Sequence, residues 1–217
     1  MFRQTEFALL ENWRLKLTNA NNQSIIKESM AKYGFNDVKL VAGNDLLQNT
    51  VNIWDFNKQE DIETAQASNK FKTVKQELHT LFMEHRTKAR DLMLSDHPDA
   101  VVALKLAGNT PDAYQDWLAL VKLFYKGLDN NPSYKETLFE FNVSEEDLTK
   151  AKDLIVSVEH NRSEYLREVG ESEDATKQKD AAFATMAKWM KKFDAAARHA
   201  LADHPQLLEA LGIKRKS

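Results

Sequence analysis

The chain has 217 residues, of which 42% are hydrophobic, and a formal net charge of −3. This length is enough for one large domain or two small ones. It contains no cysteine, which excludes disulfides, thiolate metal sites and cysteine nucleophiles. The sequence has no signal-peptide core, and no apolar run approaches the roughly 20 residues that a membrane span needs. The small negative charge gives no general attraction to nucleic acid. These features predict a cytoplasmic protein.

The first half of the chain places apolar residues at helical spacing between short polar breaks. Asn36 is positioned to cap a helix, with Phe35 and Leu40 as the hydrophobic staple around it. A polar stretch at residues 57–69 is expected to separate two helices. The helices predicted for this half lie at about 4–18, 25–33, 36–54, 71–92 and 98–106.

The second half follows the same plan. Residues 144–147 resemble a capping box, and Val143 with Leu148 forms the staple. Gly127 and Gly170 stand where an apolar periodic segment stops, as a glycine at a helix C-terminus does. No segment shows the clean two-residue alternation of a strand beside a turn. Thr110-Pro111 is expected to cap the first helix of this half. The helices predicted here lie at about 111–126, 132–141, 144–169, 172–201 and 205–211.

The two halves also align with each other. A shift of 108 residues pairs Asn36 with Ser144, so that the caps and staples of the two halves coincide. A shift of 107 residues pairs the Asp-His-Pro triplets at 96–98 and 203–205. The near-constant spacing predicts an internal duplication.

The predicted fold is all-α, with two tandem, internally duplicated helical bundles packed together. Each bundle is expected to hold about four helices plus a short closing one. The first repeat spans 1–109 and the second spans 110–217. Whether the repeats form two domains or one compact unit stays open from the sequence.

The repeated Asp-His-Pro triplet has two interpretations. In the structural one, Asp96 and Asp203 cap the short helix that follows, and the proline fills its first turn. In the functional one, His97 and His204 face each other across a pseudo-twofold axis as a metal or acid–base pair. Capping explains Asp and Pro but leaves the histidines unexplained. All four residues are therefore candidates for a site at the seam between the halves.

Motifs for catalysis and cofactor binding are absent from the sequence. No two histidines lie three or four residues apart, and no Glu is followed by His three residues later. The helix-borne metal sites of metalloproteases and di-iron bundles are therefore missing. There is no phosphate-binding glycine loop and no nucleophile elbow. We expect no catalytic residue, cofactor or metal, and we interpret His85, on an apolar stripe, as a hydrogen-bonded core histidine.

Two surface features are further candidates. Trp54 and Phe56 come at the predicted end of a helix, where Trp54 either plugs the bundle end or forms an exposed contact surface with Phe56. The end of the chain is basic, and the segment 136–174 is acidic. These segments either pack side by side or leave a basic patch for an anionic partner. The predicted basic patch comprises Lys188, Lys191, Lys192, Arg198, Lys214, Arg215 and Lys216.

The stretch 200–213, Ala-Leu-Ala-Asp-His-Pro-Gln-Leu-Leu-Glu-Ala-Leu-Gly-Ile, resembles the ends of uncharacterised helical proteins found in bacteria. The similarity extends from Trp189 onward. The resemblance implies a bacterial, helical, duplicated protein, and it brings no functional residue with it.

The leading hypothesis is a non-enzymatic helical module that binds another protein or itself at the inter-half seam. One alternative is a bundle that binds a small ligand, or an enzyme, with its site at that seam. Another is binding of an anion or nucleic acid through the basic C-terminal helix, although no nucleic-acid-reading motif accompanies the charge. No insertion into a membrane is expected.

Overall fold

The computed structural model describes residues 5–213, except for the side chains of residues 94–96. Within these limits the chain forms eight helices and no strand, which confirms the all-α prediction. No helix in the described range is both long enough and apolar enough to cross a membrane.

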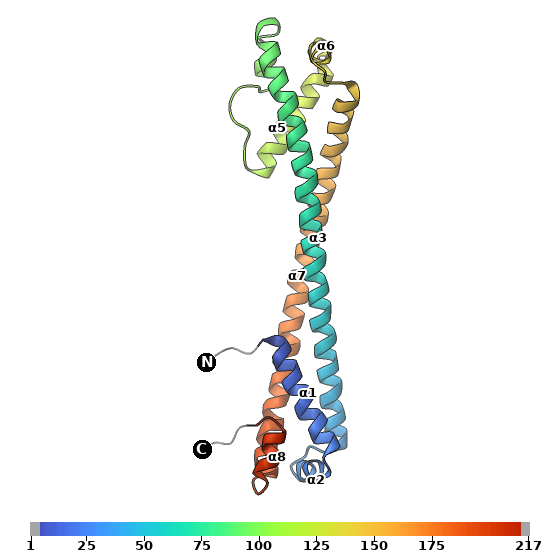
Figure 1. Cartoon of the computed structure of the whole chain (residues 1–217), viewed down its shortest axis with the longest axis vertical. Coiled ribbons are helices and arrows are strands. Elements are labelled where there is room, and N and C mark those ends of the chain that lie inside the picture. The colour runs from blue at the N-terminus through green and yellow to red at the C-terminus, as the bar shows by residue number, and fades with distance from the viewer. Residues whose placement is uncertain (1–4, 214–217) are drawn as a thin grey trace. The chain divides into compact units, whose positions relative to one another are not determined.

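The helices form two compact units, and each is described by itself. The first unit is built from the chain up to Ile62 and from Gly170 onward. It holds a helical pair, the first part of one long helix, the last part of another, and a short closing helix (Figure 1). These elements are α1 (Glu6–Asn22), α2 (Ser24–Lys32), α3 (Asp37–Asp96) up to Ile62, α7 (Glu145–Ala200) from Gly170, and α8 (Pro205–Ala210).

The second unit is the continuous segment Glu63–Val169. It holds the rest of α3, α4 (Ala100–Ala103), α5 (Tyr114–Asn130), α6 (Pro132–Glu140) and the first part of α7. Each unit therefore combines segments from both predicted repeats. The boundaries 1–109 and 110–217 stay a prediction about the sequence repeat, and the tandem arrangement of bundles stays a prediction as well.

The core of the first unit is aromatic and aliphatic. Leu10, Trp13 and Leu17 lie on one face of α1 at helical spacing and are at most 4% exposed. Phe35 meets the ring of Phe193 edge-on, with the ring centroids 5.5 Å apart. Burial of each such side chain contributes about 1.5–3 kcal/mol, so this unit depends on contacts between α1–α3 and the last part of α7.

The core of the second unit has the same character. Phe82 of α3 is fully buried and meets Phe124 of α5 edge-on, with the ring centroids 5.5 Å apart. Leu138 of α6 and Leu148 of α7 close the same core. This unit likewise depends on contacts between distant parts of the chain.

The helix bounds recur along the chain. α5 begins and ends 108 residues after α1, and α6 begins and ends 108 residues after α2. The start of α7 likewise lies 108 residues after the start of α3. Fully buried core residues recur at the same spacing: Met30 corresponds to Leu138, and Ala89 corresponds to Ala197.

The four short helices end in the same way. A residue with positive φ follows each, and a buried apolar residue comes next. The amide of that apolar residue donates back across the turn in a Schellman-type arrangement, as in Phe35 to Met30 (3.0 Å) and Ile213 to Leu208 (3.0 Å). The positive-φ residues are Gly34 after α2, Lys105 after α4, Asn142 after α6 and Gly212 after α8.

Two predicted N-caps are confirmed. The backbone amide of Lys39 donates to Asn36 Oδ1 (3.1 Å) at the start of α3. At the start of α7, Ser144 and Asp147 each use a side-chain oxygen to accept the other's backbone amide, at 3.1 and 2.9 Å. This reciprocal pair is a capping box with Asp in place of Glu.

Four predicted helix boundaries are wrong. α5 begins at Tyr114 with Ala113 as its N-cap, so the predicted cap at Thr110-Pro111 is wrong. α3 runs unbroken through residues 57–69, because this polar stretch contains neither Gly nor Pro and its side chains are compatible with a helix. α7 likewise continues through Gly170, and α5 continues past Gly127. A single glycine costs a helix only about 1 kcal/mol, which long flanking segments tolerate. Trp54 accordingly lies inside α3 and not at a helix end.

Gly43 is required by packing, since the indole of Trp189 lies against it. A Cβ at position 43 would lie 2.4 Å from Trp189 Cη2 and Cζ2, well inside van der Waals contact. Gly170 is the opposite case, because a Cβ there meets nothing within 4 Å. The two glycines therefore form a matched pair for substitution.

Gly43→Ala is expected to destabilise the protein by about 1–2 kcal/mol, because the overpacking cost exceeds the gain in helix propensity. Gly170→Ala is expected to stabilise it by up to about 1 kcal/mol through helix propensity alone. Urea unfolding of both variants measures these changes. Equal stabilisation by the two substitutions would contradict the close approach of Trp189.

Candidate functional sites

The first Asp-His-Pro triplet belongs to the second unit. His97 is half-buried, and its ring meets that of Tyr134 edge-on with the centroids 5.2 Å apart. The Tyr134 hydroxyl donates to Asp99 Oδ2 (2.5 Å), and this bond lowers the pKa of the Asp99 carboxyl. The N-cap of α4 is Asp99, without a side-chain capping bond. The predicted cap at Asp96 is therefore wrong in position, and the side chain of Asp96 lies outside the described atoms.

The second triplet belongs to the first unit. The N-cap of α8 is His204, again without a side-chain capping bond. Asp203 and His204 are both exposed, so capping by Asp203 is also wrong. Since His97 and His204 lie in different units, their pairing at a seam stays a prediction.

Trp54 and Phe56 point to different surroundings, as residues two apart on a helix do. Trp54 is half-buried, its indole N–H donates to Glu6 Oε2 (3.0 Å), and its ring lies 6.3 Å from that of Phe7. Lys179 Nζ lies 2.8 Å from the other oxygen of Glu6. Glu6 thus joins α1 to α3 and α7 inside the first unit. Phe56 is 49% exposed.

The predicted basic patch is exposed where the structure describes it. Lys188, Lys191, Lys192 and Arg198 all lie on the surface of the last part of α7. Lys214, Arg215 and Lys216 fall outside the described residues. The side chains of this patch face solvent and line none of the cavities described below.

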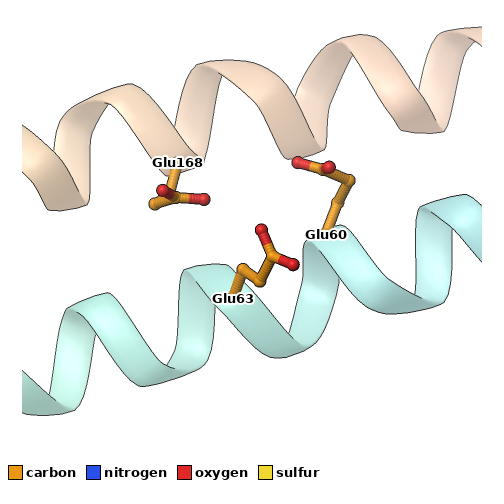
Figure 2. Close-up of side chains that lie close together, drawn as sticks. All are labelled: Glu60, Glu63 and Glu168. Atoms are coloured by element: carbon orange, nitrogen blue, oxygen red, sulfur yellow. The ribbon is translucent and has the colours of Figure 1, made fainter.

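A pair of carboxylates that the sequence reasoning missed lies between α3 and α7 in the second unit. Glu63 and Glu168 extend toward each other from the two helices (Figure 2). One carboxylate oxygen of each lies within 4.8 Å of the other. Glu60, also drawn there, lies one turn earlier on α3 and falls in the first unit. Glu168 is 8% exposed and bonds to the guanidinium of Arg167. The sequence carried a signal for this pair, because Glu60 and Glu63 recur 108 residues later as Glu168 and Glu171.

Carboxylate oxygens are the ligands that hard cations such as Ca²⁺ take, usually six to eight at a time. The two carboxylates of Glu63 and Glu168 offer far fewer oxygen ligands than that. Acidic groups in such proximity are common without an ion, and we do not assign a metal site to them.

His85 and Tyr125 form a buried polar pair in the core of the second unit. His85 is 2% exposed, and its Nδ1 lies 3.0 Å from the Tyr125 hydroxyl. This confirms the prediction of a hydrogen-bonded core histidine. Burial lowers the pKa of His85 below its usual 6.5 and raises the pKa of Tyr125. The pair therefore favours a neutral imidazole in the folded protein.

This pair is expected to make stability pH-dependent. Below pH 6.5 the unfolded chain protonates His85 more readily than the folded one, so stability falls as pH falls and is constant above that window. One such group gives a slope of at most about 1.4 kcal/mol per pH unit. Urea unfolding between pH 5 and 8 should show a smaller slope in His85→Leu/Tyr125→Phe than in the wild type. His204→Gln, at an exposed histidine, should leave the slope unchanged, and an unchanged slope in the double variant would contradict the assignment.

Arg86 anchors the loop between α4 and α5. Its side chain is buried, and Nη2 donates to the carbonyl oxygens of Lys105 (2.9 Å), Ala107 (3.3 Å) and Gly108 (3.1 Å). Burial lowers the pKa of this guanidinium, but it remains charged at neutral pH. In the described part of the chain no carboxylate pairs with it, so carbonyl dipoles alone offset the buried charge.

A cavity of about 350 Å³ lies beside this loop, between α3 and the start of α5. Lys72, Lys75 and His79 of α3 line it, together with Asp112 and Trp117. The indole N–H of Trp117 donates to His79 Nδ1 (3.1 Å), and Lys75 Nζ lies 5.1 Å from the centre of the Trp117 ring. The cavity thus has a basic wall and a fixed aromatic floor.

Two further cavities adjoin each other at the turn from α6 to α7. One has a volume of about 430 Å³ and is lined by Glu146, Asp153 and Leu154 among others. Lys150 lines it too, and its ammonium group pairs with Glu77 at 2.9 Å. The other has a volume of about 520 Å³ and is lined by Phe139 among others. Glu145 lines both. This turn therefore combines apolar and acidic side chains around open concave surface.

Comparison with known proteins identifies no relative: no family model, no curated protein and no solved structure matches the chain. The resemblance of residues 200–213 to bacterial helical proteins stays a prediction.

Proposed function

We propose that the protein is a non-enzymatic helical module that binds another protein through the turn from α6 to α7. We call this surface the acidic corner, and we define it as Phe139, Phe141, Glu145, Glu146 and Asp153. The observation that carries the proposal is the exposure of two phenylalanines beside two adjoining cavities with an acidic rim.

Phe139 and Phe141 are exposed to solvent and do not belong to the buried core of the unit. Phe139 is 42% exposed and Phe141 is 46% exposed, although they are large and apolar. Large aromatic side chains provide most of the binding energy at protein interfaces when a partner buries them. Phe139 lines one of the cavities and Phe141 follows it two residues later, so this surface gives such a partner both apolar area and concave shape.

The charges of the acidic corner specify the chemistry of the partner. Glu145 lies 3.5 Å from Lys135, whereas neither Glu146 nor Asp153 forms an ion pair within the described residues. Acidic residues in the first turn of α7 stabilise its N-terminus. That role accounts for Glu145 and Glu146 but not for Asp153, which lies two turns further on. The surface therefore fits an amphipathic helix that carries both apolar and basic residues.

The test begins with photo-crosslinking from p-benzoylphenylalanine placed at position 141, followed by identification and purification of the captured protein. Its affinity is then measured for the wild type, Phe139→Ser/Phe141→Ser and Glu146→Lys/Asp153→Lys. Both double variants are expected to weaken binding at least about tenfold. Val102→Ser is the matched control, because Val102 is 81% exposed in the same unit but lines neither cavity.

Several results would overturn the proposal. One is an identified partner whose affinity is unchanged by Phe139→Ser/Phe141→Ser. Another is a partner whose contact segment lacks basic residues. If the wild type instead dimerises, and the same variant is monomeric by light scattering, the occupant is a second copy of this chain.

We further infer that the chain is an internal duplication. The recurrence of helix bounds, buried positions and left-handed closing residues at a spacing of 107 or 108 supports this. A cytoplasmic location and a bacterial source complete the proposal, and both rest on the sequence alone.

A further inference from the structure

The basic cavity beside Trp117 has no part in the proposed protein contact. Lys72, Lys75 and His79 occupy successive turns on one face of α3, so their side chains converge on the same space. Neither lysine forms an ion pair within the part of the chain that the structure describes. The only carboxylate on the described lining is that of Asp112, so two lysines outweigh it and the cavity attracts an anion.

His79 adds a hydrogen-bond donor beside the two lysines. The indole N–H of Trp117 can only donate, so His79 Nδ1 must accept, which places the imidazole proton on Nε2. Trp117 is 2% exposed, so this bond is held rigidly by the core of the unit. The cavity therefore presents a preorganised N–H beside two cations.

The residues 108 positions later lack all of these groups. Lys72, Lys75 and His79 correspond to Asp180, Phe183 and Ala187. Phe183 packs against Trp13, with the ring centroids 5.7 Å apart. The basic wall is thus specific to the second unit and is not required by a helix packed in this way.

We propose that this cavity binds the phosphate group of a small molecule that also carries an amine or a hydroxyl. Two lysines match the double negative charge of a phosphomonoester better than the single charge of a carboxylate. Asp112, on the same lining, accepts a hydrogen bond from the amine or hydroxyl. A volume of about 350 Å³ suits a ligand of this size.

The probes are inorganic phosphate, O-phosphoethanolamine and acetate, added to the full chain at constant ionic strength. Occupancy of the cavity is followed by NMR through the indole N–H resonance of Trp117. That resonance is assigned by its disappearance in Trp117→Phe. Phosphate and O-phosphoethanolamine are expected to shift it saturably, with O-phosphoethanolamine binding more tightly. Asp112→Asn should remove that difference and leave phosphate binding in place.

Lys72→Gln/Lys75→Gln is expected to weaken phosphate binding at least about tenfold, because both positive charges of the cavity wall are lost. The matched control is Lys188→Gln/Lys191→Gln, which removes two exposed lysines with the same spacing in the first unit. Thermal unfolding of both variants verifies that the fold is intact.

The assignment is overturned if no phosphate probe gives a saturable shift, or if both lysine pairs weaken binding equally. Acetate binding as tight as phosphate would overturn the choice of phosphate. Flotation with vesicles that contain phosphatidic acid distinguishes a lipid headgroup from a soluble molecule. Flotation that depends on Lys72 and Lys75 would overturn the soluble ligand.

Discussion

Residues 1–109 and residues 110–217, produced as separate chains, are each expected to stay unfolded alone and to fold together on mixing. Each core takes side chains from both segments. Phe35 packs on Phe193 in the first unit, and Phe82 packs on Phe124 in the second. A single segment therefore leaves half of each core exposed to water. Circular dichroism and light scattering of each segment and of the equimolar mixture measure the result.

Two controls sharpen this experiment. The fragment 63–169 contains the whole core of the second unit and is expected to unfold cooperatively by itself. A homodimer of 1–109 is disfavoured, because a second copy would have to replace residues 110–217. Arg86 would then stand in the place of Asp194, 108 residues later, and would set a second positive charge against Lys16. In the protein, buried Lys16 binds both oxygens of Asp194 at 2.8 Å. Cooperative unfolding of 1–109 as a monomer or homodimer would contradict the prediction.

Arg86→Met is expected to destabilise the protein by about 3 kcal/mol. The substitution removes a charged donor that serves three carbonyl groups of the loop after α4, and a carbonyl that loses its partner in a buried place is costly. Urea unfolding gives the free energy of unfolding. Amide hydrogen exchange at residues 105–110 should show loss of protection in this loop.

Arg90→Met is the matched control, since Arg90 lies one turn further along α3 and is exposed. Its ion pair with Asp91 (3.4 Å) is also exposed and contributes little. A similar loss of stability in both variants would contradict the anchoring role of Arg86.

The sequence predicted those parts of the fold that depend on neighbouring residues. Periodicity gave the helices, and the caps at Asn36 and Ser144 followed from a few adjacent side chains. His85 was placed in the core because its helix has one apolar face. Local signals gave wrong helix ends in the two long helices. Gly170 and the polar stretch 57–69 were expected to end helices, but the free-energy cost of these residues in a helix is small compared with the stability of the long helices around them.

Pairing between distant segments could not be predicted in the same way. Helical periodicity indicates which face is buried but not which helix covers it. The sequence therefore did not reveal that Lys16 would bind Asp194 or that Arg86 would anchor the loop after α4. The cavity at Trp117 was missed for the same reason, since His79 and Trp117 are 38 residues apart and belong to no known motif.

The discontinuous first unit has a consequence for synthesis on the ribosome. Its α1–α3 segment emerges early, yet the residues that cover it begin at Gly170. At about 5–20 residues per second, Leu10 and Trp13 wait for roughly ten seconds or more before Met186 and Phe193 appear. The second unit is complete in that interval and can fold first. The nascent chain therefore exposes apolar surface on α1 and α2, where a holding chaperone would bind until Met186 and Phe193 have emerged.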